Sequence, residues 1–169
     1  MVQRKLGIIA IVTVILAACG YQFSGSGELP EGVQTIYISV FENRTGEVGL
    51  ENSLTNEVVN EFVLKRKNAL VEKGSAESVL HGTIVSIRDE TISRSGANNP
   101  LERRVVLTVS LVLKDRDGQI LWAARQVSSN EDYDVSNDRQ VTDENRLDAL
   151  DDLFERLAET IYNRLTEDF

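Results

Sequence analysis

The residues that could perform acid–base or metal chemistry are few in this chain. His81 is the only histidine and Cys19 the only cysteine among 169 residues, so no site with two histidines can form. A histidine–cysteine pair would need Cys19 as a free thiol, and its sequence context argues against that. His81 lies among strand-forming residues, where a structural role is favoured. The acidic run Glu131–Asp134 could bind a cation weakly, but a solvated loop is the favoured interpretation. The sequence therefore predicts no catalytic residue, no metal site and no cofactor.

Cys19 has a different chemical context, because it follows an export signal. Arg4 and Lys5 precede 13 apolar or small residues, a stretch shorter than the roughly 20 residues that a membrane-spanning helix needs. The stretch ends in Leu16-Ala17-Ala18-Cys19, which resembles the lipobox of bacterial lipoproteins. We therefore expect residues 1–18 to be removed and Cys19 to carry lipid.

The predicted anchor also suggests a location. Several acyl chains on Cys19 would hold the protein on a membrane, since each buried methylene contributes about 0.8 kcal/mol. Gly20, rather than an aspartate, follows the cysteine, which by resemblance to the lipoprotein sorting rule favours the outer membrane. We expect residues 19–33 to form a lipidated N-terminus and tether, and residues 34–169 to form a single domain.

The charge of the chain excludes one class of partner. Removal of residues 1–18 takes away two of the 18 basic residues and none of the 27 acidic ones, which leaves 151 residues with a net charge of −11. Nucleic-acid binding requires a basic surface, so no nucleic-acid partner is expected. Any anionic ligand must instead meet a local basic cluster.

Arginines provide such a cluster. Arg94, Arg103 and Arg104 flank the loop at 95–100, and Arg139 lies in the polar stretch before the second predicted helix. The guanidinium fork can grip a phosphate group through two hydrogen bonds. The alternative for each arginine is a solubilising surface residue with local salt bridges.

The N-terminal half of the domain is predicted as a strand and then a helix. Residues 34–41 are β-branched and aromatic, with Ile36, Ile38 and Val40 on one face. Apolar residues then recur every four positions, as in an amphipathic helix of four to five turns that ends at Lys65–Lys67: Leu50, Leu54, Val58 and Phe62.

The C-terminal half is predicted as a hairpin and a second helix. A strand-like segment at 77–94 has a mixed pattern, whereas residues 105–113 alternate cleanly and pass through a turn at Asp115–Gly118 into a strand at 119–129. Residues 130–141 carry no strand or helix signal. A second helix is expected from Thr142, with an apolar stripe that includes Leu147 and an ion pair between Asp152 and Arg156.

Together these elements predict the fold class α+β. We expect a two-layer sandwich with two amphipathic helices packed on one face of a mainly antiparallel four- to five-stranded sheet. The helices should cover the face that carries Leu107 and Leu111, and the opposite face should stay largely polar.

Five segments, in order, carry a family resemblance: Cys19–Phe23, Leu29–Ile36, Phe41–Thr45, Gly49–Thr55 and Ala76–Ile84. With the lipobox, they resemble the lipopolysaccharide-assembly lipoprotein (LptE) family. The resemblance implies a plug that sits partly inside a large outer-membrane β-barrel (LptD), faces the periplasm and the barrel lumen, and helps insert lipopolysaccharide into the outer leaflet. It also implies lipopolysaccharide binding by loop residues, which places Arg94 at one such position and a second near Asp138 and Arg139.

The residues themselves leave other functions open. A periplasmic adaptor lipoprotein that regulates a cell-wall enzyme would share the anchor and the fold. A lipid-anchored hydrolase is a third possibility, although the chain offers few catalytic residues. The polar sheet face suits the water-filled lumen of a barrel better than lipid, which favours the plug.

Overall fold

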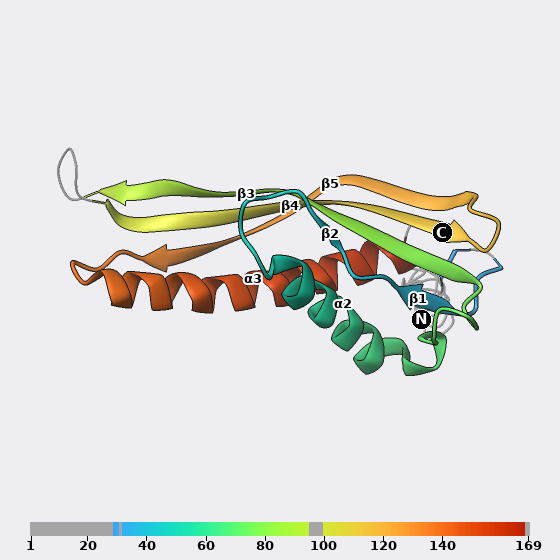
Figure 1. The fold of residues 1–169 in the computed structure, drawn as a ribbon. Coiled ribbons are helices and arrows are strands. Elements are labelled where there is room, and N and C mark those ends of the chain that lie inside the picture. Colours follow the sequence, from blue (N-terminus) through green and yellow to red (C-terminus); the bar gives the residue numbers. More distant parts are fainter. Residues whose placement is uncertain (1–28, 31, 95–99, 168–169) are drawn as a thin grey trace, which may run out of the picture.

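A five-stranded mixed sheet with two helices on one face makes up the computed structural model (Figure 1). The structure describes residues 29–30, 32–94 and 100–167. The expectations for Cys19, for removal of residues 1–18 and for most of the tether therefore lie outside the described residues. The elements, in chain order, are β1 (Ile36–Ile38), β2 (Glu42–Asn43), α2 (Leu50–Arg66), a 3-10 turn η1 (Lys67–Ala69), β3 (Ser78–Arg94), β4 (Pro100–Asp115), β5 (Ile120–Asp134) and α3 (Arg139–Glu167).

The sheet is mostly antiparallel and has the order β1-β3-β4-β5, with β2 also paired to β3. Strands β3, β4 and β5 form a long meander, whereas β1 and β2 pair with β3 in parallel. The α+β two-layer sandwich is confirmed.

The core lies between the sheet and the helices. Alternate residues of β4, including Leu107 and Leu111, are fully buried, which confirms that the helices cover this face. Helix α3 supplies Leu157 and Ile161, also fully buried, and α2 packs against α3 with the rings of Phe62 and Tyr162 edge to face at 5.0 Å. In Figure 1 both helices lie on the same side of the sheet, and α3 runs along most of its length.

Two expectations for the acidic segment after residue 129 were wrong. Strand β5 continues to Asp134, because its polar residues have cross-strand partners: Asp132 lies opposite Arg104, and Tyr133 lies opposite Arg103. Helix α3 begins at Arg139 rather than Thr142, because the Asp138 side chain accepts a hydrogen bond from the backbone N–H of Gln140 at 2.9 Å and so caps the helix.

Three side chains also differ from the expected pattern. Val40 lies beyond the end of β1 and is 61% exposed, and Leu147 is 59% exposed although it belongs to the predicted apolar stripe. Arg156 pairs with Glu131 on β5 at 2.8 Å, not with Asp152, because α3 packs directly over that strand.

Candidate functional site

The candidate arginines gather at the end of the sheet farthest from β1 (Figure 1). Arg94 is the last residue of β3, is exposed and lies opposite Pro100. Arg139 is the first residue of α3, and its side chain is 94% exposed, with only a distant contact of 3.9 Å to Asp143. The loop at 95–99 lies outside the described residues. This end of the molecule therefore presents Arg94 and Arg139 to solvent from two different elements.

Arg104 faces the side of the sheet away from the helices and is already engaged. Its Nε and Nη2 donate to the two carboxylate oxygens of Asp132 at 2.6 and 2.9 Å, a bidentate pair between neighbouring strands. This pairing raises the pKa of Arg104 and lowers the pKa of Asp132. An anionic ligand would have to displace Asp132, so Arg104 is a poorer phosphate ligand than its exposure suggests.

Arg103 lies on the opposite face from its neighbour, since side chains alternate along a strand. It stands across from Thr91 and Tyr133, and its charge contributes to lowering the pKa of Asp89. The structure therefore separates Arg103 from Arg104, which the sequence placed side by side. Arg103 belongs with the polar groups beneath α3.

Four polar side chains between the sheet and α3 form a cluster that was not predicted from the sequence. We call it the ion cluster, and its members are Glu47, Asp89, Tyr133 and Arg146. The Arg146 guanidinium donates to both Asp89 oxygens at 3.1 Å and to Glu47 Oε1 at 2.7 Å, while the Tyr133 hydroxyl donates to Asp89 Oδ1 at 2.7 Å. The cluster ties β3 and β5 to α3 and to the loop that precedes α2. It therefore holds together the elements that carry the candidate arginines.

The pKa shifts in this ion cluster follow from its geometry. Burial acts to raise the pKa of Asp89, but the hydrogen bonds from Arg146 and Tyr133 outweigh burial and the net pKa is lowered. Burial opposes the charged form of Arg146 as well, yet the bonds to Asp89 and Glu47 raise its pKa. Burial and the bond to Asp89 both raise the pKa of Tyr133. All three groups therefore stay in their usual charge states at neutral pH.

The face of β3, β4 and β5 away from the helices forms a broad polar surface, which we call the open face. Among the described residues no helix covers it (Figure 1). Its centre carries hydroxyl groups at half-exposed or exposed positions, and Thr108 and Ser128 hydrogen-bond across the strands at 2.8 Å. The hydroxyl residues of the open face include Thr83, Ser86, Thr108, Ser110 and Ser128.

His81 lies on β3 with Nδ1 3.2 Å from the Ser39 hydroxyl, and burial together with Lys114 and Lys73 lowers its pKa. Among residues 29–30, 32–94 and 100–167, no group of three or more histidine, cysteine or acidic residues is placed to hold a metal ion. No helix of the described chain has the length and apolar character needed to cross a membrane.

Comparison with known proteins adds a family and a fold. The profile of a family described as lipopolysaccharide-assembly (LptE) matches residues 33–165. No curated protein matches the sequence significantly.

Solved structures of several lipoproteins share the fold. The rare lipoprotein B of Shewanella oneidensis is 15% identical, with a TM-score of 0.55 over 76% of this chain and 92% of that one. The uncharacterized lipoprotein B of Nitrosomonas europaea is also 15% identical, with a TM-score of 0.58 over 83% and 85%. A minor lipoprotein of Acinetobacter baumannii is 17% identical, with a TM-score of 0.51 over 80% and 93%. At these identities the likeness concerns the fold alone.

Proposed function

Because this chain belongs to the LptE lipopolysaccharide-assembly family, we propose that it is an outer-membrane lipoprotein anchored through Cys19 that binds inside a large β-barrel partner of the LptD type. In this role the folded domain faces the periplasm and the barrel lumen. It acts by binding and not by catalysis. It assists the transfer of lipopolysaccharide into the outer leaflet.

The open face is the observation that supports barrel binding. In a two-layer sandwich, the sheet face that no helix covers can pack directly against another protein. The hydroxyl groups of Thr108 and Ser110 and the Arg104–Asp132 pair make this face polar, which suits the hydrated inner wall of a barrel. The helix layer, with its acidic exterior, then lies on the other side.

A charge reversal on the open face tests barrel binding. Arg104→Glu places a carboxylate beside Asp132, and Ser110→Glu adds a second charge near the centre of the face. We expect this double variant of the full-length lipidated protein to lose a co-purifying large β-barrel when it is captured from detergent-solubilised outer membranes. The matched control makes the same change of −3 in net charge on the helix layer, with Arg164→Glu on α3 and Asn60→Glu on α2, both at exposed positions.

The same capture experiment distinguishes barrel binding from the alternative function, that of a periplasmic adaptor lipoprotein. Capture of a cell-wall synthase in place of a barrel by the unaltered protein would support the adaptor function instead. Unchanged barrel capture by the open-face variant, with its folding verified by thermal melting, would contradict barrel contact through this face.

Arg94 and Arg139 are the arginines that we propose for lipopolysaccharide. Both are exposed at the end of the sheet opposite β1, whereas Arg103 lies on the helix side and Arg104 lies on the open face, which we assign to the barrel. Phosphate groups on the glycolipid would be gripped by the two guanidinium forks.

Binding of purified lipopolysaccharide tests this assignment. We expect Arg94→Glu with Arg139→Glu to weaken binding by about tenfold or more, since each charged hydrogen bond contributes about 1.5–3 kcal/mol. The matched control combines Arg164→Glu, near the other end of α3, with Lys73→Glu, an exposed position in the loop before β3, and so changes the net charge by the same −4. Equal effects of the two changes would show that only net charge matters.

A further inference from the structure

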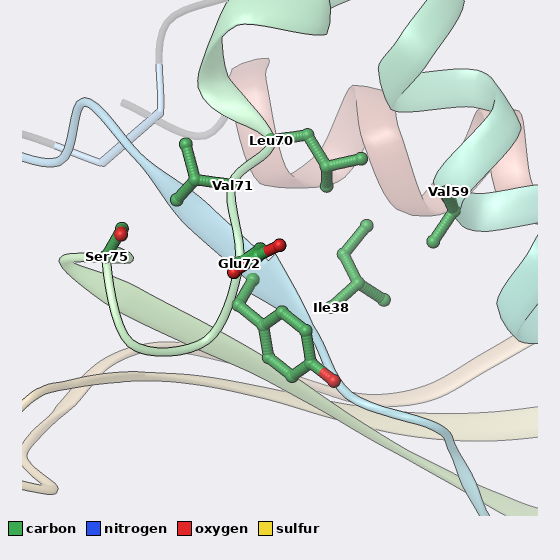
Figure 2. A pocket seen from close by; sticks show the side chains of 7 residues that line it. Ile38, Val59, Leu70, Val71, Glu72 and Ser75 are labelled. Carbon is green, nitrogen blue, oxygen red and sulfur yellow. The ribbon is translucent and has the colours of Figure 1, made fainter.

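An apolar pocket of about 610 Å³ lies beside β1 (Figure 2). Because β1 pairs with the beginning of β3, the pocket lies at the end of the sheet opposite the candidate arginines. In Figure 2 the side chains of Ile38, Val59 and Leu70 point toward one another across it. Its remaining lining residues come from β1 and from the segment after η1: Tyr37, Val71, Glu72 and Ser75. Apolar groups dominate the lining, so the pocket suits an apolar occupant and not an ion.

The chain enters the described structure at the same end of the molecule. Leu29 is 4% exposed and belongs to the core, and Val33 packs against that core. The backbone N–H of Val33 donates to the carbonyl of Pro30 at 2.9 Å, and Gly32 has a φ of 87°. This is a reverse turn with glycine at its third position, where a positive φ is required. The turn reverses the direction of the chain between Leu29 and Val33.

The spacing along the chain matches the position of the pocket. Ile38 lies five positions after Val33, which is about 17 Å of extended chain. Phe23 lies six positions before Leu29, which would be about 20 Å if that segment is extended. An extended segment before the turn would thus bring Phe23 level with Ile38 and the pocket.

The composition of that segment fits the pocket as well. Between Cys19 and Leu29 the only large apolar residues are Tyr21 and Phe23, and their spacing of two places both side chains on one side of an extended chain. We propose that the tether docks on the folded domain, with Phe23 and Tyr21 inserted into the pocket lined by Ile38, Val59 and Leu70. The domain is then held close to its membrane anchor, whichever protein it binds through its open face.

Thiol protection in the outer membrane tests the proposal. Val59→Cys places a thiol in the pocket of the full-length exported protein, and Leu64→Cys places one on the same helix at a position that is 80% exposed. Cys19, the only natural cysteine, is expected to be blocked by lipid. We expect Tyr21→Ser with Phe23→Ser to speed maleimide modification at position 59 by about tenfold or more, since an occupied pocket must open before it reacts. Modification at position 64 should not change.

A cross-linking experiment identifies the occupant directly. A benzophenone amino acid in place of Phe23 should cross-link to the segments around residues 37–38, 59 and 70–75, as mapped by mass spectrometry. The proposal is overturned if position 59 is equally reactive with and without the two aromatic residues. It is also overturned if the cross-links fall on lipid or on another protein, because an acyl chain or a partner would then be the better occupant.

Discussion

Replacement of Arg146 by methionine should reveal how strongly the ion cluster stabilises the fold. The guanidinium hydrogen-bonds to Asp89 and Glu47, and the exposed fractions of the three side chains are 22%, 27% and 38%. Breaking a fully buried pair costs about 3–5 kcal/mol, and an exposed pair is worth at most about 1 kcal/mol. For this partly buried cluster we expect a loss of about 2–3 kcal/mol in the free energy of unfolding. The melting temperature should fall by about 5–10 °C.

The pH dependence gives a second and more specific result. In the unaltered protein the folded-state pKa of Asp89 lies below its ordinary value of 3.8, so the stability that it contributes is present above that pH. That stability is lost as the pH falls through the lower folded-state pKa. Without Arg146, burial remains while the largest opposing influence is lost, so we expect the pKa of Asp89 to rise and its protonation at low pH to reduce the cost of the unpaired carboxylate. The stability difference between the two proteins should therefore shrink from pH 7 to about pH 4.

Denaturant titrations at both pH values measure these quantities. Arg44→Met is the matched control, since Arg44 pairs with Glu42 at the surface and their side chains are 64% and 59% exposed. We expect this control to cost less than about 1 kcal/mol. Adding Asp89→Asn to Arg146→Met should recover part of the loss, because no unpaired carboxylate remains at that position. A loss from Arg146→Met that equals the control, or that does not change with pH, would refute this account of the ion cluster.

Three further predictions concern other contacts. Gly82→Ala should destabilise the fold by about 1–3 kcal/mol in thermal melts, because a Cβ there would lie 2.5 Å from the buried Phe41 ring, and Phe41→Leu should rescue part of the loss. Thr55→Val should lower the free energy of unfolding by about 1–3 kcal/mol, because the backbone N–H of Phe41 donates to the Thr55 hydroxyl at 3.0 Å and would lose this acceptor. A loss of stability no larger than that of a Thr→Val change at an exposed position would contradict this role. In an ultraviolet titration Tyr133 should ionise above the ordinary tyrosine range, and Asp89→Asn should bring its pKa down; an unchanged titration would exclude the contact between them.

The regular patterns made most of the fold predictable. The clean alternation of β4 and the four-residue spacing of α2 identify which faces are buried. Strand β3 could not be assigned a buried side, because the register shifts between Ile84 and Ser86. Leu80 and Ile84 face the core before this bulge, whereas Ile87 lies on that side after it, so the pattern in the sequence changes phase.

The ion cluster was missed because its members lie far apart in the chain. Asp89 and Arg146 are separated by 57 residues, and Glu47 and Arg146 by 99. One signal was available: Arg146 precedes Leu150 by four positions and so lies in line with the apolar stripe of α3. A charged residue at such a position implies a buried partner, but the sequence alone does not say which carboxylate it is.

The parallel pairing of β1 has a consequence for how the protein folds. Strands β3, β4 and β5 follow one another and pair through short connections, so their contacts are local and can form early. Ile36 pairs with Ser78, 42 residues later, so β1 is synthesised before its partner strand exists. We expect Val109→Ala in the meander to slow refolding, and Ile38→Val in β1 mainly to speed unfolding. We therefore expect β1, although it is synthesised before its partner strand, to be fixed in place after the meander, so that the edge of β3 stays unpaired until the crossover through α2 has formed.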